Sequence, residues 1–496
     1  MSSLKKLIRS GQFASGTTDL EGLLVTHATS FKKIWSTHEG GPDNLGTTFY
    51  DPVAIPHGYS SLGSYAQPNN IPLFGHILVA KDVSNNPLKP ILKLPIDYVL
   101  KWTSHFLNLT KDGEGHAVGY EITNEFKKPP LDKVSCVHVN FVDDTTKKSS
   151  LNVATKVAFE SQNFVDLNGL NVHGSMGGFK LENECLGNLQ GNAMNSMPNM
   201  TQINVLIKAY SPVIYFHPDE EYLPSSVDWF FENGGSDDEQ YWIHLPDDDA
   251  SRERVKKGDL QTARAYYHIK PVFGGLFTDI SVWIFYPFNG PSTVKVLSFT
   301  KHFETVGEHI GDWEHVTLRI SNINGELNSV YFAQHGWGEW VTASALEWDT
   351  NSKIVVYSSL HHHSSYSKPG TVLYGWKGKH VVGMLDMAAL SDKIMDTGVE
   401  AVVVAAEYLG GAVVEPPWLN YMRKWGPKID YKQVKDALHA IENSLNFILR
   451  ELFEKLIQYL PKELLGENGP TGPKAKNSWN GDEELRFAQL IKGYAI

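Results

Sequence analysis

Two carboxylates that lie two residues apart are the strongest chemical feature of this sequence. Asp312 and Glu314 occur in residues 307–320, GEHIGDWEHVTLRI, where a turn leads into a strand-like stretch. Side chains alternate along a strand, so these carboxylates are predicted to share one face, with Trp313 and His315 on the other. Two carboxylates on one face repel each other unless a cation, a proton or a set of donors lies between them. The pattern predicts a metal site; the alternative is a solvated strand edge with a core tryptophan behind it.

Further candidate ligands lie between residues 217 and 363. Oxygen ligands such as those of Asp312 and Glu314 suit calcium or magnesium, and added imidazoles would shift the preference towards zinc. His361 and His363 are expected to share a strand face that excludes His362. Each histidine has the alternative of being an ordinary core or loop residue. The predicted metal ligands are Asp312, Glu314, His309, His217 and Asp219, and the predicted binding residues are Trp313, His335, His361 and His363.

Most signatures of enzymes are absent from the sequence. It contains no phosphate-binding Gly-rich loop followed by Lys and Ser or Thr, no HExxH, no CxxC pair and no GxSxG elbow. Cys136 and Cys185 are expected to be buried strand or turn residues. A water activated by a metal at Asp312 and Glu314 is the remaining route to chemistry. We therefore expect a binding protein rather than an enzyme and predict no catalytic residues.

Composition and charge narrow the classes of function. The net charge of −12 over 496 residues argues against binding along a nucleic-acid backbone, which requires a basic surface. Two cysteines do not make a disulfide-rich secreted scaffold, and the first residues, MSSLKKLIRSGQF, lack the apolar core of a signal peptide. The most apolar stretch, residues 399–414, is shorter than the roughly 20 residues of a membrane-spanning helix and is expected to be buried. A cytoplasmic location, or a peripheral one at membranes, is predicted.

The N-terminal third carries a faint internal repeat. Gly63, Gly119 and Gly174 lie in similar glycine-rich surroundings, 56 and 55 residues apart. A near-constant period indicates one small unit used three times. Residues 1–185 are therefore predicted to form a three-fold β-prism-like domain, with an irregular sandwich as the alternative.

The rest of the chain is predicted to hold a second β domain and a helix. Residues 186–205 are expected to be a linker, residues 206–427 a β-sandwich, and residues 428–496 an amphipathic helix with an extended tail. The helix is expected at residues 431–460, and a short helix capped by Ser225 or Ser226 after Pro224. Strands are predicted at residues 210–216, 263–268, 279–286, 315–320, 329–334 and 354–359. The predicted fold class is mainly β.

Several long motifs resemble a plant family described as vacuolar protein sorting-associated. They include WSTHEGGPDNLG, YFHPDEEYLPSSVDWFF, FTDISVWIFYPFNGP and DTGVEAVVVAAEYLGG, and the resemblance covers residues 31–482. It implies an N-terminal part similar to the β-prism domains of membrane-trafficking adaptors, which bind acidic membranes. The sequence departs from that family at His362, where a small residue is more usual, and at residues 383–390, GMLDMAAL, where the pattern is more polar.

The stretch HIGDWEHV is also similar, more distantly, to the GHRHDWE core of the necrosis- and ethylene-inducing cytolysins. That resemblance implies a β-sandwich that holds a divalent cation and engages sphingolipid headgroups. His309, Asp312 and Glu314 match the first histidine, the aspartate and the glutamate of that core. Ile310 and Gly311 stand where its arginine and second histidine would be.

Together these features predict a protein that binds membrane lipid or glycan headgroups, with calcium or magnesium preferred over zinc. One alternative is a pore-forming, cytolytic or insecticidal defence protein in which the helix at residues 431–460 rearranges. The other is a metal-dependent hydrolase centred on the same carboxylates. No nucleic-acid partner is expected, and no protein partner is indicated.

Overall fold

The computed structural model describes most of residues 193–422 and shorter stretches on either side. The described residues are 13–36, 47–63, 65–68, 73, 76–94, 98–103, 121–123, 132, 135–137, 177–181, 193–235, 243–296, 299–302, 307–377, 381–422, 425–426, 436, 439, 442–443, 450–451 and 470–481. They fall into two compact units. The first comprises residues 1–198, 271–278 and 321–326, and the second comprises residues 199–270, 279–320 and 327–496.

The described part of the first unit consists of small antiparallel sheets. One has the order β1-β2-β7-β5, and others have the orders β3-β4-β6, β10-β12-β9 and β11-β8. A core of Leu20, Leu23, Val25 and Ala80 packs with Leu276, Phe277 and Ile323, which follow much later in the sequence. The strands are β1 (Thr18–Asp19), β2 (Leu23–Ala28), β3 (Ser30–Ser36), β4 (Thr47–Val53), β5 (Ser60–Ser61), β6 (Tyr65–Pro68), β7 (Ile77–Asp82), β8 (Leu92–Lys93), β9 (Tyr98–Thr103), β10 (Glu121–Thr123), β11 (Cys136–Val137) and β12 (Gly177–Leu181).

The predicted three-fold repeat stays a prediction. Gly63 is described, but Gly119 and Gly174 lie outside the described residues. The mainly β fold class is confirmed.

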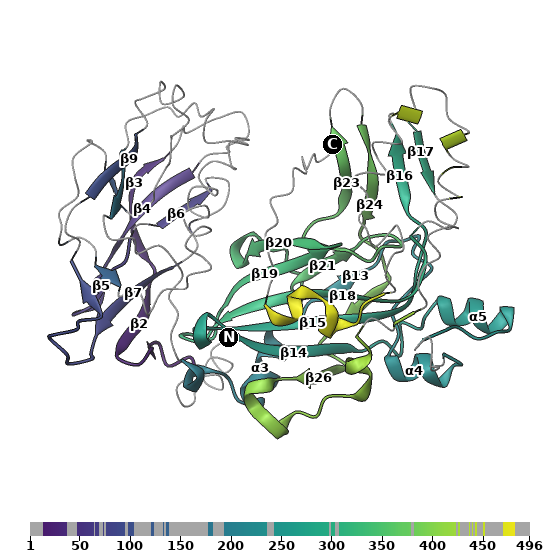
Figure 1. Ribbon diagram of the computed structural model, residues 1–496, viewed down its shortest axis with the longest axis horizontal. Coiled ribbons are helices and arrows are strands. Elements are labelled where there is room, and N and C mark those ends of the chain that lie inside the picture. The colour runs from purple at the N-terminus through teal and green to yellow at the C-terminus, as the bar shows by residue number, and fades with distance from the viewer. Residues whose placement is uncertain are drawn as a thin grey trace. The chain divides into compact units, whose positions relative to one another are not determined.

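A six-stranded sheet forms the centre of the second unit. Its order is β20-β19-β18-β15-β14-β26, and Figure 1 shows β14, β15, β18 and β19 side by side. β15 and β18 have 13 residues each, and every residue of β15 is buried, as expected for a strand covered on both faces. The strands are β14 (Ala265–Val272), β15 (Phe277–Asn289), β18 (His309–Ser321), β19 (Leu327–Gln334), β20 (Trp337–Thr342) and β26 (Ala401–Ala405).

Two four-stranded sheets accompany the central one. One has the order β22-β21-β13-β25 and the other β17-β16-β24-β23. Each predicted strand overlaps an observed one. The remaining strands are β13 (Val213–Tyr215), β16 (Thr293–Val296), β17 (Phe299–His302), β21 (Val355–Ser358), β22 (Ser365–Tyr366), β23 (Gly370–Lys377), β24 (Val381–Ala388) and β25 (Ile394–Asp396).

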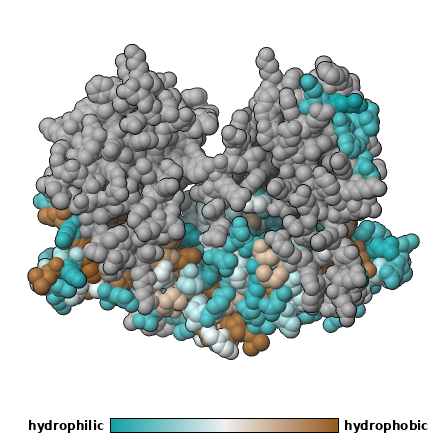
Figure 2. Space-filling model, in the orientation of Figure 1, coloured by the Kyte–Doolittle hydropathy of each residue, from teal (hydrophilic) through white to brown (hydrophobic). Residues whose placement is uncertain are grey.

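The helices among the described residues are few and short. The predicted short helix is α4 (Val227–Glu232), whose N-cap Ser226 accepts a hydrogen bond from the backbone of Trp229. α5 (Asp249–Lys256) exposes charged residues, and the surface over it is hydrophilic (Figure 2). Short 3-10 helices lie at Met194–Ser196, Phe273–Gly275, Ala343–Ala345, Glu407–Ala412, Pro417–Tyr421, Pro473–Ala475 and Asn477–Asn480. No helix among the described residues has the length and apolar character needed to cross a membrane.

Several local expectations differ from the structure. Residues 200–205, expected in the linker, begin α3 (Met200–Tyr210), because Asn199 and Gln202 form a reciprocal capping box. The stretch 399–414 is only partly buried, since Val399 and Val414 are 72% and 85% exposed. The segment 470–481, expected to lie extended on the surface, forms two 3-10 turns and buries Trp479. Most of the helix predicted at 431–460 lies outside the described residues.

The two faces of β18 have different environments, as the alternation predicts. Trp313 belongs to an aromatic core with Tyr266, Trp418 and Trp425. His315, on the same face, stacks on Trp283 with ring centroids 4.2 Å apart. The opposite face carries Asp312 and Glu314.

Candidate functional site

Gly311 places Asp312 at the start of the buried part of β18. Its φ of +68° is in the left-handed region that favours glycine. A Cβ atom there would lie 2.2 Å from the carbonyl oxygen of Trp425. The position where the cytolysin motif has a second histidine is therefore filled by neighbouring backbone.

Replacing Gly311 by alanine is expected to destabilise the protein by about 2–3 kcal/mol, through left-handed strain and overpacking. Urea unfolding followed by circular dichroism measures the change. Gly411→Ala is the control, because its Cβ meets nothing within 4 Å. Equal stability of the two variants would contradict the close approach of Gly311 and Trp425.

Asp312 is neutralised by a histidine rather than left facing Glu314. His363 Nδ1 donates to Asp312 Oδ2 at 3.0 Å, and His363 Nε2 donates to the carbonyl of Tyr222 at 3.0 Å. Because both ring nitrogens face acceptors, His363 is an imidazolium. Burial opposes its charge, but the hydrogen bond to Asp312 and the nearby carboxylates raise the pKa of His363. Burial likewise opposes the charge of Asp312, yet His363 lowers the pKa of this carboxyl to about 2.

Glu314 has a weaker partner. Its Oε1 lies 3.8 Å from Lys476 Nζ, and Lys476 also donates to the backbone carbonyl of Trp313. Burial raises the pKa of Glu314 to about 7, with Lys476 acting against the shift and Asp312 adding to it. The side chains of Asp312 and Glu314 remain 9% and 11% exposed. One carboxylate is thus held ionised, and the other changes charge near neutral pH.

The other predicted metal ligands have different partners. His309 Nδ1 donates to the carbonyl of Gly311 at 3.0 Å. His217 Nδ1 accepts a hydrogen bond from the backbone of Asp219, whose carboxylate is 83% exposed. Among the described residues, these side chains form no group of three ligand atoms with Asp312 and Glu314.

The carboxylate next to Asp219 in the sequence is the one that reaches this region. Glu220 is only 1% exposed; its Oε2 accepts from the backbone of His361 at 2.5 Å and lies 3.8 Å from His363 Nε2. The pattern YFHPDEE indicated the correct segment, but the residue of this segment that lies close to His361 and His363 is Glu220.

The three consecutive histidines lie in a turn, and the expected sharing of a strand face is wrong. His361 and His363 have φ of +67° and +56°, a left-handed conformation that histidine adopts more readily than most residues. The turn points the three side chains at different partners. His361 Nδ1 donates to the carbonyl of Pro291, His363 binds Asp312, and His362 binds Asp386.

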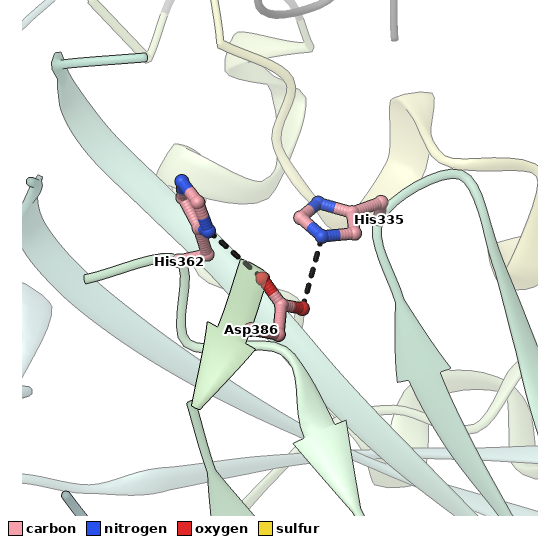
Figure 3. A group of neighbouring side chains, drawn as sticks. All are labelled: His335, His362 and Asp386. Carbon is pink, nitrogen blue, oxygen red and sulfur yellow. Dashed lines mark hydrogen bonds and ion pairs between the residues drawn. The ribbon is translucent and has the colours of Figure 1, made fainter. Parts of the chain in front are cut away.

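His335, which was predicted as a binding residue, converges with His362 and Asp386 into a group (Figure 3), and none of the three was a predicted metal ligand. His335 Nε2 donates to Asp386 Oδ2 at 3.0 Å, and His362 Nδ1 contacts Asp386 Oδ1 at 2.9 Å. The hydroxyl of Tyr366 also donates to Asp386 Oδ2, at 2.6 Å. Burial opposes ionisation of Asp386, but His335 and the hydrogen bonds of both histidines hold its pKa well below the usual range. An ionised carboxylate is thereby kept fully inside the protein.

Trp313 is placed in the core rather than at a binding surface. It is fully buried, and its ring centroid lies 5.0–5.6 Å from those of Tyr266, Trp418, Trp425 and Phe285. Asp386 and Lys476 were not identified from the sequence, and Glu220 was a candidate ligand in YFHPDEE but not one of the predicted metal ligands. A signal existed for Asp386, since it is the single charge in an apolar stretch, and buried charges of that kind are rare unless paired.

Three solved structures resemble the chain at low similarity. NLPPya in complex with glucosamine is 15% identical, with 34% of this chain and 69% of that chain covered and a TM-score of 0.24. Necrosis and Ethylene inducing Protein 2, from the causal agent of cocoa's Witches Broom disease, is 13% identical, with 41% and 74% covered and a TM-score of 0.23. A structure described as a toxin fold as basis for microbial attack and plant defense is 13% identical, with 53% and 92% covered and a TM-score of 0.23. At these TM-scores the likeness supports no inference about this chain.

A search of curated proteins gave no match. A family description matches residues 1–236 and 233–483, which is most of the sequence. The chain belongs to the family described as vacuolar protein sorting-associated protein 62.

Proposed function

We propose that the second unit binds polar headgroups of membrane lipids or glycans at Asp312 and Glu314. The observation that carries this proposal is the pair of carboxylates on one strand face, nearly buried but each retaining some exposure. Asp312 offers an ionised acceptor, and Glu314 can donate or accept near neutral pH. Lys476 adds a cation beside them. Such fixed donors and acceptors suit the hydroxyl and amino groups of a headgroup.

Burying Asp312 and Glu314 is expected to lower the stability of the protein, and this energetic cost supports a functional role for them. Buried charges destabilise a protein unless they are well paired, and perturbed carboxyl groups cluster at functional sites. His335, His361 and His363 also hold left-handed backbone conformations around this region. Conformations of that kind persist where the surrounding structure enforces them, and often at binding sites.

The preference for calcium or magnesium rests on the oxygen atoms of Asp312 and Glu314. His363 and Lys476 already balance their charges, so an ion bound there has to replace one of these contacts. Headgroup binding is therefore to be measured with and without divalent cations.

The test uses the full chain and vesicles of phosphatidylcholine with or without a glycosylated sphingolipid, together with a glycan array. The double variant Asp312→Asn, Glu314→Gln is expected to weaken binding at least about tenfold, because hydrogen bonds to charged groups are lost. Asp219→Asn is the matched control, since this carboxylate is exposed. Dye trapped in the vesicles separates binding from the leakage expected of a pore-former.

The proposal is wrong if the wild-type chain binds none of these surfaces. It is also wrong if the double variant and Asp219→Asn bind equally well.

A further inference from the structure

The group of His335, His362 and Asp386 brings three ligand types together from separate parts of the second unit. His335 lies in the two-residue connection between β19 and β20, His362 in the turn after β21, and Asp386 in β24. One potential ligand atom from each residue lies within 4.8 Å of the other two. In Figure 3 the two oxygens of Asp386 each face one imidazole. We infer that these three residues bind a first-row transition metal ion of the zinc class, independently of headgroup binding at Asp312 and Glu314.

The distances between the ligand atoms of His335, His362 and Asp386 are close to those around a bound zinc ion, so binding requires only small side-chain movements. Zinc bonds to nitrogen and oxygen are about 2.0–2.2 Å long, so tetrahedral ligand atoms lie about 3.3–3.6 Å apart. Asp386 contacts His335 through Oδ2 at 3.0 Å and His362 through Oδ1 at 2.9 Å, so the contact that includes the ligand oxygen would open by a few tenths of an ångström. The widest pair of ligand atoms, at most 4.8 Å apart, would close by up to about 1.5 Å. Rotation about side-chain torsions supplies movements of this size.

The surroundings orient the ligands as outer partners in metal sites do. His362 Nε2 lies 2.8 Å from the hydroxyl of Ser292. When Nε2 donates to Ser292, Nδ1 presents its lone pair towards Asp386, which is the tautomer that a metal ligand needs. Tyr366 orients the carboxylate of Asp386 through its hydroxyl. Outer hydrogen bonds of this kind fix ring orientation and raise the affinity of metal sites.

The mixture of ligands selects the class of ion. Two imidazoles and one carboxylate suit zinc and related first-row ions, whereas calcium and magnesium prefer oxygen ligands alone. Asp386 is 0% exposed, so its negative charge needs a buried positive partner. A divalent ion supplies that charge directly; without metal, the carboxylate is held by its contacts with His335, His362 and Tyr366.

His335 gives the site its access. Its side chain is 11% exposed, compared with 3% for His362. Its φ of +55° turns the side chain from the hairpin end towards Asp386. Three protein ligands leave a coordination position for water or a bound molecule on this more open side.

The experiment uses the full chain after treatment with a chelator. Zn²⁺ affinity is measured by competition with a chromogenic chelator, and Co²⁺ is added as a spectroscopic probe. Wild type is expected to bind one equivalent of Zn²⁺ and to give the intense visible absorption of four- or five-coordinate Co²⁺, with no competition from millimolar Ca²⁺ or Mg²⁺. His335→Gln, which keeps a hydrogen-bonding group, is expected to lose the Co²⁺ absorption and to bind Zn²⁺ more than about 100-fold more weakly. Ser292→Ala is expected to weaken binding about 10–100-fold.

His361→Gln is the matched control, because its imidazole lies in the same turn outside the group, and its Zn²⁺ affinity should equal that of wild type. Circular dichroism checks that each variant is folded; if His335→Gln is not, Ser292→Ala provides the decisive comparison. A wild-type protein without one equivalent of tightly bound Zn²⁺ overturns the inference and leaves a metal-free hydrogen-bonded cluster. Equal Zn²⁺ affinities of His335→Gln and His361→Gln overturn it as well. Failure of headgroup binding leaves this result unchanged, because no vesicle or glycan is present.

Discussion

Trp313→Ala is expected to lower the free energy of unfolding by about 3–5 kcal/mol, the usual cost of truncating a fully buried tryptophan. The side chain is 0% exposed. It packs against Tyr266, Trp418 and Trp425 on the face of β18 opposite the carboxylates. Its removal leaves a cavity that neighbouring large rings cannot readily fill. Urea unfolding followed by far-ultraviolet circular dichroism gives the change.

Two further variants test whether the loss of stability in Trp313→Ala comes from the missing buried ring. Trp313→Phe is expected to be milder than Trp313→Ala, because it keeps a ring and because Trp313 Nε1 makes no hydrogen bond within the described structure. Trp348→Ala, at a side chain that is 41% exposed, should change stability by less than about 0.5 kcal/mol. If Trp313→Ala is as stable as wild type but loses headgroup binding, Trp313 belongs to the binding surface, as the sequence suggested.

The faces of β18 could be predicted because alternation along a strand is a local property. The order Asp312, Trp313, Glu314 is sufficient to place the carboxylates on one side and the indole on the other. The short helix α4 was predictable for a similar reason, since its cap at Ser226 lies next to the helix in the sequence. These inferences required no knowledge of distant parts of the chain.

The partners of the carboxylates could not be predicted in this way. His363 lies 51 residues from Asp312, and Lys476 lies 163 residues from Trp313, whose carbonyl it binds. The sequence left open whether a cation, a proton or donors would separate Asp312 from Glu314. In the structure, the imidazolium of His363 lies beside Asp312 and the ammonium group of Lys476 lies beside Glu314. Only the tertiary fold brings these groups together.

The three consecutive histidines could not be placed from the sequence for a different reason. Spacing within a strand would pair His361 with His363, but the chain turns at this point, and positive φ angles at both residues redirect their side chains. A turn with non-glycine residues in the left-handed conformation has no firm sequence signal. His362 consequently meets Asp386, which lies 24 residues further along the chain.

Glu314→Gln is expected to stabilise the protein at pH 8 and to have little effect at pH 4.5. Burial raises the folded-state pKa of Glu314 from 4.5 to about 7. The folded state therefore holds this proton more tightly than the unfolded state, and stability falls as the pH rises through this range. The ionised side chain costs on the order of 3 kcal/mol at pH 8. Glutamine stays neutral and avoids most of that cost.

Chemical unfolding of both proteins at pH 4.5 and pH 8, in the presence of a chelator, measures the difference. Glu253→Gln is the control, because that carboxylate is 60% exposed and should show no dependence of this kind. A loss of stability in Glu314→Gln that is equal at both pH values would mean that Glu314 is ionised and well paired at pH 4.5. A gain at pH 8 together with weaker headgroup binding would show that the buried carboxylate is kept at the expense of stability, as expected of a residue selected for binding.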